Sequence, residues 1–275
     1  MNTKLLITSL AIISAAPTVF ADTVDDYVIA EQRAALQENT QGKGFGPQSP
    51  RDIDSLTGKN QRVFNTAPAA SQMNLCNIHF HKNAEHKGGE FNKYAGNGDG
   101  KGNNTGYLYT GKLTKEELKP FNQAQSSLQS GDTIELHYVY TTAQVKPGPT
   151  LGSCLSDSVM NPQLRVETQV SVLVNDKNAL DFETLTAYSL KNSYYQALNI
   201  PNNTGTPIQY AGSTTGPSYN EQGSPLQVTW SVRPQVNKVD IASVENWLEG
   251  NDFKENHAHG VRNLVVNPDL LSSGH

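Results

Sequence analysis

The chain has 275 residues, of which 36% are hydrophobic and 17% are charged, and its formal net charge is −5. This length suits one large domain or two small ones. The acidic balance argues against nucleic acid and against an anionic membrane surface as partners, because both bind through basic patches.

The first residues have the pattern of a secretory signal peptide. Lys4 precedes an apolar run at residues 5–16, and Val19-Phe20-Ala21 resembles a cleavage site. The run is shorter than the roughly 20 residues that span a bilayer, and no second run of that length follows. We therefore expect cleavage after Ala21, export to the periplasm or the cell exterior, and one mature domain, residues 22–275, without membrane attachment. An uncleaved anchor helix is the alternative.

Short strands dominate the rest of the chain. Apolar and polar residues alternate with a period of two in three segments, which predicts three strands. Two further strands and two short helices are also predicted. The predicted strands are residues 75–81, 133–142, 164–175, 228–234 and 236–241, and the predicted helices are residues 28–36 and 242–248. Many short strands, long loops and few helices predict a mainly β domain with minor helices, built on one large, central, mostly antiparallel twisted sheet.

Three histidines on two of these strands predict a metal site. His79 and His81 are two residues apart, so they point to the same face of a strand. His137 lies on the next confident strand, and pairing of the two strands would bring the three imidazoles together. Three histidines around one open position are typical of a catalytic zinc site. The alternative is that these are buried strand residues without a metal.

The two cysteines predict a disulfide. Cys76 and Cys154 are the only cysteines, and an isolated pair in an oxidising compartment is expected to form a bridge. Such a bridge would hold the start of the His79 strand. A cysteine that acts as a metal ligand or a nucleophile is the alternative.

Several motifs in this chain resemble those of carbonic anhydrases. The cysteine followed by His-x-His-x-x-x-Glu-His, at residues 76–86, resembles the delta class. Five pieces resemble the alpha class in the same order and with similar spacing: residues 48–50, 78–81, 135–137, 210–217 and 228–230. The resemblance implies an alpha-carbonic-anhydrase-like fold and zinc-dependent, reversible hydration of carbon dioxide to bicarbonate and a proton, by attack of zinc-bound hydroxide.

The resemblance also assigns roles to the residues around the metal. His79, His81 and His137 would bind Zn²⁺. Asn77 would orient the first histidine through its amide, and Glu135 would accept the ring N–H of the third. Partners of this kind fix the tautomer and the direction of a metal-bound imidazole.

A second group of roles concerns the substrate. Glu85 matches a glutamate that accepts a hydrogen bond from a gatekeeper threonine, and Thr215 is the gap-free choice for that threonine. Thr214 then takes the preceding pocket position, although a shift by one residue would make Thr214 the gatekeeper. Val139 and Trp230 match the apolar pocket for carbon dioxide.

The proton path departs from the alpha pattern. No histidine lies between Asp22 and Ile78, where alpha enzymes often carry a shuttle histidine, so His86 is the candidate shuttle, beside His257 and His259. The sequence leaves a homodimer open.

Two rival functions remain. One is a non-catalytic zinc-binding protein of the same fold. The other is a cupin-like metalloprotein, although the glycine and the spacing that a cupin motif requires are missing.

Overall fold

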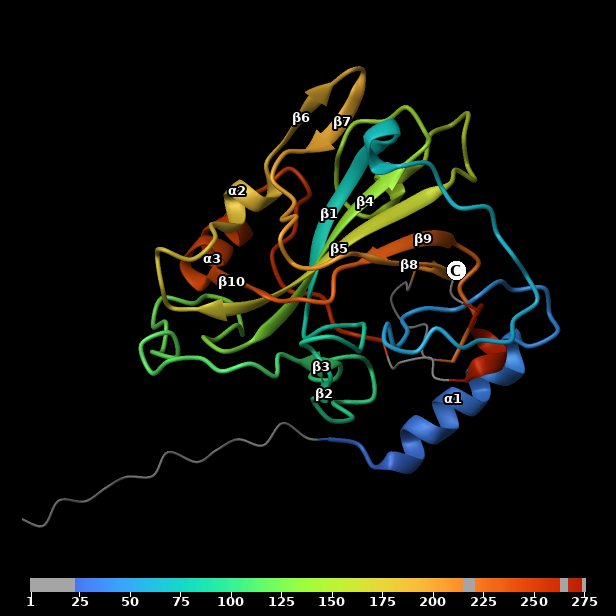
Figure 1. The fold of residues 1–275 in the computed structure, drawn as a ribbon, viewed down its shortest axis with the longest axis horizontal. Coiled ribbons are helices and arrows are strands. Elements are labelled where there is room, and N and C mark those ends of the chain that lie inside the picture. Colours follow the sequence, from blue (N-terminus) through green and yellow to red (C-terminus); the bar gives the residue numbers. More distant parts are fainter. Residues whose placement is uncertain (1–22, 215–220, 263–266, 274–275) are drawn as a thin grey trace, which may run out of the picture.

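The computed structural model describes residues 23–214, 221–262 and 267–273. Its centre is a six-stranded sheet in the order β1-β4-β5-β9-β8, with β10 paired to β5 beside the end of β9 (Figure 1). The six strands are β1 (Asn74–Lys82), β4 (Thr133–Thr141), β5 (Leu164–Val174), β8 (Ile208–Ser213), β9 (Gln227–Val232) and β10 (Asn237–Asp240). The prediction of a mainly β fold on one large sheet is confirmed.

The sheet is mixed, which corrects the prediction in one respect. The pairs β1–β4, β4–β5 and β8–β9 are antiparallel, whereas β5 pairs in parallel with both β9 and β10. The long segment between β5 and β9 makes the parallel pairing feasible, because a parallel pair requires a crossover rather than a tight turn. This segment carries α2 (Phe182–Thr186), the hairpin β6 (Tyr188–Lys191) and β7 (Tyr194–Ala197), and β8.

The helices lie around the sheet. α1 (Asp26–Thr40) contains the predicted helix at residues 28–36, and α3 (Ile241–Glu249) contains the one at residues 242–248. α2 and α3 lie together on one side of the molecule, far from α1 (Figure 1). The remaining elements are β2 (Lys93–Tyr94), β3 (Tyr107–Leu108) and three short 3-10 helices: η1 (Ala70–Gln72), η2 (Leu151–Cys154) and η3 (Pro268–Leu270). None of the described helices is long and apolar enough to cross a membrane.

One face of β1 and β4 builds the hydrophobic core. Ile78 and Phe80 from β1 pack in one cluster with Leu136 and Tyr138 from β4, and α2 and α3 cover this cluster. Each fully buried apolar side chain of this size stabilises the fold by about 1.5–3 kcal/mol relative to an exposed one. Every residue of β4 is buried, so the opposite face of the strand is covered as well.

The predicted disulfide is confirmed, because Cys76 and Cys154 are bonded and both residues are fully buried. The predicted signal peptide, residues 1–21, lies outside the described residues and stays a prediction.

Candidate metal centre

Strand pairing brings the three predicted histidines together. β1 and β4 are antiparallel neighbours, and His79 lies directly opposite His137. His81 follows two residues later on the same face of β1. The ring centroids lie 5.3 Å (His79–His81), 5.0 Å (His79–His137) and 4.8 Å (His81–His137) apart, and one nitrogen of each ring lies within 4.8 Å of the other two. The three side chains can therefore share one metal ion.

Each ring is oriented by an oxygen acceptor on its outer nitrogen. These acceptors carry no hydrogen, so the outer nitrogen must be the N–H and the inner nitrogen must carry the lone pair. The three contacts are His79 Nδ1 to Asn77 Oδ1 at 2.6 Å, His81 Nδ1 to the Gly260 carbonyl at 2.8 Å, and His137 Nε2 to Glu135 Oε1 at 2.7 Å. Asn77 and Glu135 thus lie where their predicted roles require.

The inner nitrogens have the chemistry of metal ligands. His79 Nε2 and His137 Nδ1 face each other at 3.2 Å, so two lone pairs meet there. Burial and the neighbouring imidazoles hold the pKa of His79 well below its ordinary value of 6.5. Burial also lowers the pKa of His81, although Glu85 opposes this effect. Neutral imidazoles that converge in this way fit a divalent cation such as zinc.

Glu135 is the negative charge behind this centre. The residue is fully buried, which raises the pKa of its carboxyl, but His86 and His137 outweigh burial and hold the pKa well below its ordinary value of 4.5. His86 donates to this carboxylate from its backbone N–H at 3.1 Å and contacts it through ring Nδ1 at 2.7 Å. The carboxylate is therefore ionised and held from two sides.

His86 does not fit the predicted proton shuttle. Its side chain is fully buried, and both ring nitrogens are occupied, Nδ1 by Glu135 and Nε2 by the Tyr210 hydroxyl at 2.6 Å. The Tyr210 hydroxyl also contacts the Ser49 hydroxyl. A shuttle must exchange protons with bulk water, which His86 does not reach. His86 instead belongs to a buried chain of hydrogen bonds that ends on Glu135.

Glu85 and the threonines flank the metal position. Glu85 is buried, with Oε2 3.6 Å from His137 Nε2 and 3.8 Å from His81 Nε2. Thr215, the predicted gatekeeper, lies outside the described residues. The buried Thr214 hydroxyl bonds to no acceptor in the described part of the chain, Glu85 included. The structure therefore does not favour Thr214 as the gatekeeper.

A small cavity opens beside the three histidines. Its volume is about 20 Å³, which is room for about one water-sized group. One part of its wall is polar and the other part is apolar. The lining residues are His79, His81, Glu85, His137, Val139, Leu151, Val166, Thr214 and Trp230. The three predicted pocket residues Val139, Thr214 and Trp230 thus line the same cavity as the predicted ligands.

The comparison with protein families agrees with this geometry. The family model for delta carbonic anhydrase matches residues 70–243, a segment that contains β1, β4 and all three histidines. The chain belongs to the delta carbonic anhydrase family. This assignment makes the chain a carbonic anhydrase, an enzyme of carbon dioxide hydration, and it removes the cupin alternative.

Two solved structures of alpha-carbonic anhydrases are also similar to the chain. The first is "Photobacterium profundum alpha-carbonic anhydrase", with 16% identity over 82% of this chain and 88% of that chain, and a TM-score of 0.28. The second is the alpha-carbonic anhydrase from Thermovibrio ammonificans with the inhibitor sulfanilamide, with 16% identity over 80% and 84% and the same TM-score of 0.28. No curated protein matches the chain. The family assignment rests on the family model alone.

The sequence analysis named His257 and His259 only as candidate shuttles and missed that their segment lies against the three histidines. Gly260 supplies the acceptor for His81, and the His259 ring lies 5.3 Å from the His79 ring. The His259 side chain is 40% exposed, contacts Glu255 Oε2 at 2.6 Å and stacks on His257. The His-x-His spacing of residues 257–259 was a visible signal, but a backbone carbonyl such as that of Gly260 has no sequence signature.

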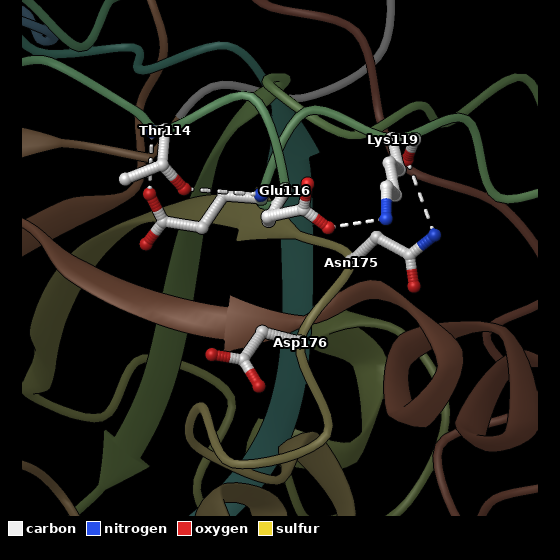
Figure 2. Close-up of a pocket in the computed structure, with 6 residues that line it drawn as sticks. Thr114, Glu116, Lys119, Asn175 and Asp176 are labelled. Atoms are coloured by element: carbon white, nitrogen blue, oxygen red, sulfur yellow. Dashed lines mark hydrogen bonds and ion pairs between the residues drawn. The ribbon is translucent and has the colours of Figure 1, made fainter.

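A larger hollow, of about 510 Å³, shares no lining residue with the cavity at the histidines (Figure 2). It is lined by Thr114, Glu116, Glu117, Lys119, Asn175 and Asp176. Glu116 pairs with Lys119, and Glu117 Oε1 accepts from Lys238 Nζ at 2.5 Å. The charges of Glu116 and Glu117 are thus neutralised within the chain, so the smaller cavity at the histidines is the better candidate for the functional site.

Proposed function

We propose that this carbonic anhydrase is an exported zinc enzyme whose metal is held by His79, His81 and His137. The observation that carries the proposal is the set of three imidazoles, each fixed through its outer nitrogen, whose inner nitrogens converge. A bound zinc ion is a Lewis acid that lowers the pKa of a coordinated water to ~7 and so supplies the nucleophile for carbon dioxide.

The residues around the metal position orient the three imidazoles and provide an apolar surface beside them. Asn77, Gly260 and Glu135 keep the three rings aimed at one point. Val139, Val166 and Trp230 offer apolar surface beside that point, which suits a small apolar substrate such as carbon dioxide. Bicarbonate, the charged product, gains nothing from this wall, so the wall favours its release.

The gatekeeper belongs to the same proposal. We expect the Thr215 hydroxyl to donate to Glu85, which then leaves the threonine oxygen to accept a hydrogen bond from the attacking group. The buried position of Glu85 beside the cavity supports this arrangement.

Export and assembly complete the proposal. The signal-like residues 1–21 and the Cys76–Cys154 disulfide both suit an oxidising compartment, the periplasm or the cell exterior. All the residues named above lie in one chain, so the site does not need a homodimer, although a homodimer is compatible with it.

One experiment tests the catalytic proposal. The purified protein is assayed for zinc content and for carbon dioxide hydration in a stopped-flow instrument, beside His137→Ala. We expect the wild type to hold one zinc per chain and to be active, and His137→Ala to lose both. The control is Lys191→Ala, an exposed side chain on the hairpin of β6 and β7 and outside the triad, which should keep both.

Two outcomes would contradict the proposal. A folded, zinc-loaded wild type without activity would leave the non-catalytic zinc-binding protein as the better reading. Zinc retained by His137→Ala would remove His137 from the ligand set.

A further inference from the structure

The loop that carries Cys154 folds back onto the metal strand. This disulfide loop, residues 142–163, connects β4 to β5, and three links join it to β1. The first link is the Cys76–Cys154 bond. In the second, the Gly148 N–H donates to the Cys76 carbonyl at 3.0 Å, and in the third, Asn77 Nδ2 donates to the Gly148 carbonyl at 3.0 Å. The loop is therefore joined to two consecutive residues of β1, Cys76 and Asn77, which lie just before His79 in the sequence.

The third link reaches the metal centre. The amide of Asn77 is planar, so the hydrogen bond from Nδ2 to Gly148 also sets the direction of Oδ1. That oxygen lies 2.6 Å from Nδ1 of His79 and fixes the His79 ring. The position of the disulfide loop is thus transmitted to the first metal ligand through one rigid side chain.

The same loop supplies part of the cavity wall. η2 is a single turn that begins at Leu151 and ends at Cys154. Leu151 lines the cavity on the apolar side with Val139 and Trp230. The Cys154 carbonyl is also held by the Thr141 hydroxyl of β4 at 2.8 Å. Because the turn is so short, fixing Cys154 also limits where Leu151 can lie.

We propose that the Cys76–Cys154 disulfide is a positioning element of the metal centre. The affinity for zinc and the position of Leu151 in the cavity wall would then depend on whether the two cysteines are oxidised. The inference rests on the proposed zinc enzyme and deepens it. In the reduced chain, the S–S bond is replaced by two thiols that have taken two electrons and two protons from an external dithiol, which becomes a disulfide itself. A chain that keeps its thiols would then bind zinc weakly, and oxidation after export would complete the site.

The first test compares zinc affinities. The dissociation constant of zinc is measured by competition with a chromophoric chelator, for the wild type and for the double variant Cys76→Ala/Cys154→Ala. We expect about 10–100-fold weaker binding in the double variant, as for other losses of support behind a metal ligand. Cobalt substitution adds a spectroscopic readout, since a misplaced His79 changes the visible spectrum of the bound cobalt.

A matched control separates positioning from general loss of stability. Leu185→Ala removes a buried side chain from the core on the opposite face of the sheet, away from the loop. Its folded state should bind zinc as tightly as the wild type. Equal zinc affinity in the double cysteine variant and the wild type, or an equal loss in Leu185→Ala, would overturn the inference.

Two variants with an intact disulfide test the same contacts if the double cysteine variant does not fold. Asn77→Ala cuts the path from the loop to His79 and should weaken zinc binding by about tenfold. Leu151→Ala should raise the KM for carbon dioxide severalfold and leave zinc affinity unchanged. Unchanged zinc affinity in Asn77→Ala, or an unchanged KM in Leu151→Ala, would contradict the proposed role.

This outcome is distinct from failure of the proposed enzyme. An inactive, zinc-loaded wild type would refute the catalytic proposal, whereas equal zinc affinities with and without the disulfide would refute only the positioning role.

Discussion

The two faces of β1 follow different rules. Ile78 and Phe80 point into the core, where apolar contact with α2 and α3 is all that they require. Asn77, His79 and His81 point to the other face, where the amide of Asn77 and the outer ring nitrogen of each histidine have hydrogen-bond partners of their own. The same nine-residue strand therefore supplies stability on one face and chemistry on the other. This difference predicts that substitutions on the two faces should fail in different assays.

The largest effect on stability should come from the core face. Phe80 is fully buried, and its ring packs against Phe182 at 5.3 Å and Trp247 at 6.0 Å between centroids. Phe80→Ala should lower the free energy of unfolding by about 3–5 kcal/mol, because it removes the side chain and leaves a cavity. Urea unfolding measures this loss. The zinc affinity of the folded variant should stay unchanged. Weaker zinc binding without a loss of stability would contradict the separation of the two faces.

Glu135→Gln should show the opposite pattern on the metal face. The glutamine keeps the shape of the side chain but loses the charge, and its NH₂ group would meet an N–H of His86 or His137. We expect zinc affinity to fall by about 10–100-fold. Chelator competition measures it, with Glu167→Gln on β5 as the control. A variant that binds zinc like the wild type would show that the charge behind His137 is unimportant.

The contrast between the faces also explains what could be predicted from the sequence. A period of two is a local signal, so the strand at residues 75–81 and the shared face of His79 and His81 were visible in advance. The parallel pairing of β5 with β9 was not, because strand direction depends on how a distant segment returns to the sheet. The buried contacts of His86 were not visible for a related reason, because its partners Glu135 and Tyr210 are far away in the sequence.

Tyr210→Phe should have a smaller effect and should test how far the metal face extends. Without the hydroxyl, Nε2 of His86 and the hydroxyl of Ser49 each lose a buried partner. A buried polar group left unpaired costs about 1–3 kcal/mol, so the free energy of unfolding should fall by that amount. Zinc affinity should fall less than in Glu135→Gln, since Glu135 keeps its bond to His137. A larger loss of zinc in Tyr210→Phe would mean that the chain from Ser49 to Glu135 positions the metal directly.

Mild acid should produce the smallest effect. Burial and the imidazoles around it hold the pKa of His79 well below 6.5. As the pH falls below 6.5, His79 therefore takes up a proton in the unfolded chain but stays neutral in the folded protein. The unfolded state thus binds more protons below about pH 6.5, and the free energy of unfolding of the metal-free protein should fall as the pH falls from there. The lowered pKa of Glu135 adds to the loss once the pH falls below its ordinary value of 4.5.

Above about pH 6.5 the imidazole is neutral in both states, so the melting temperature of the metal-free protein should change little with His79 between about pH 6.5 and 7.5. Protons should compete with zinc at His79 only below the lowered pKa, so protonation of His79 should not weaken zinc binding over the same range. Thermal unfolding of the metal-free protein and chelator competition, both measured across this range and down to about pH 5, check the two statements. A melting temperature that rises on acidification would show that His79 is protonated more easily in the folded protein than in the unfolded chain, and the metal face would then not be preorganised for a cation.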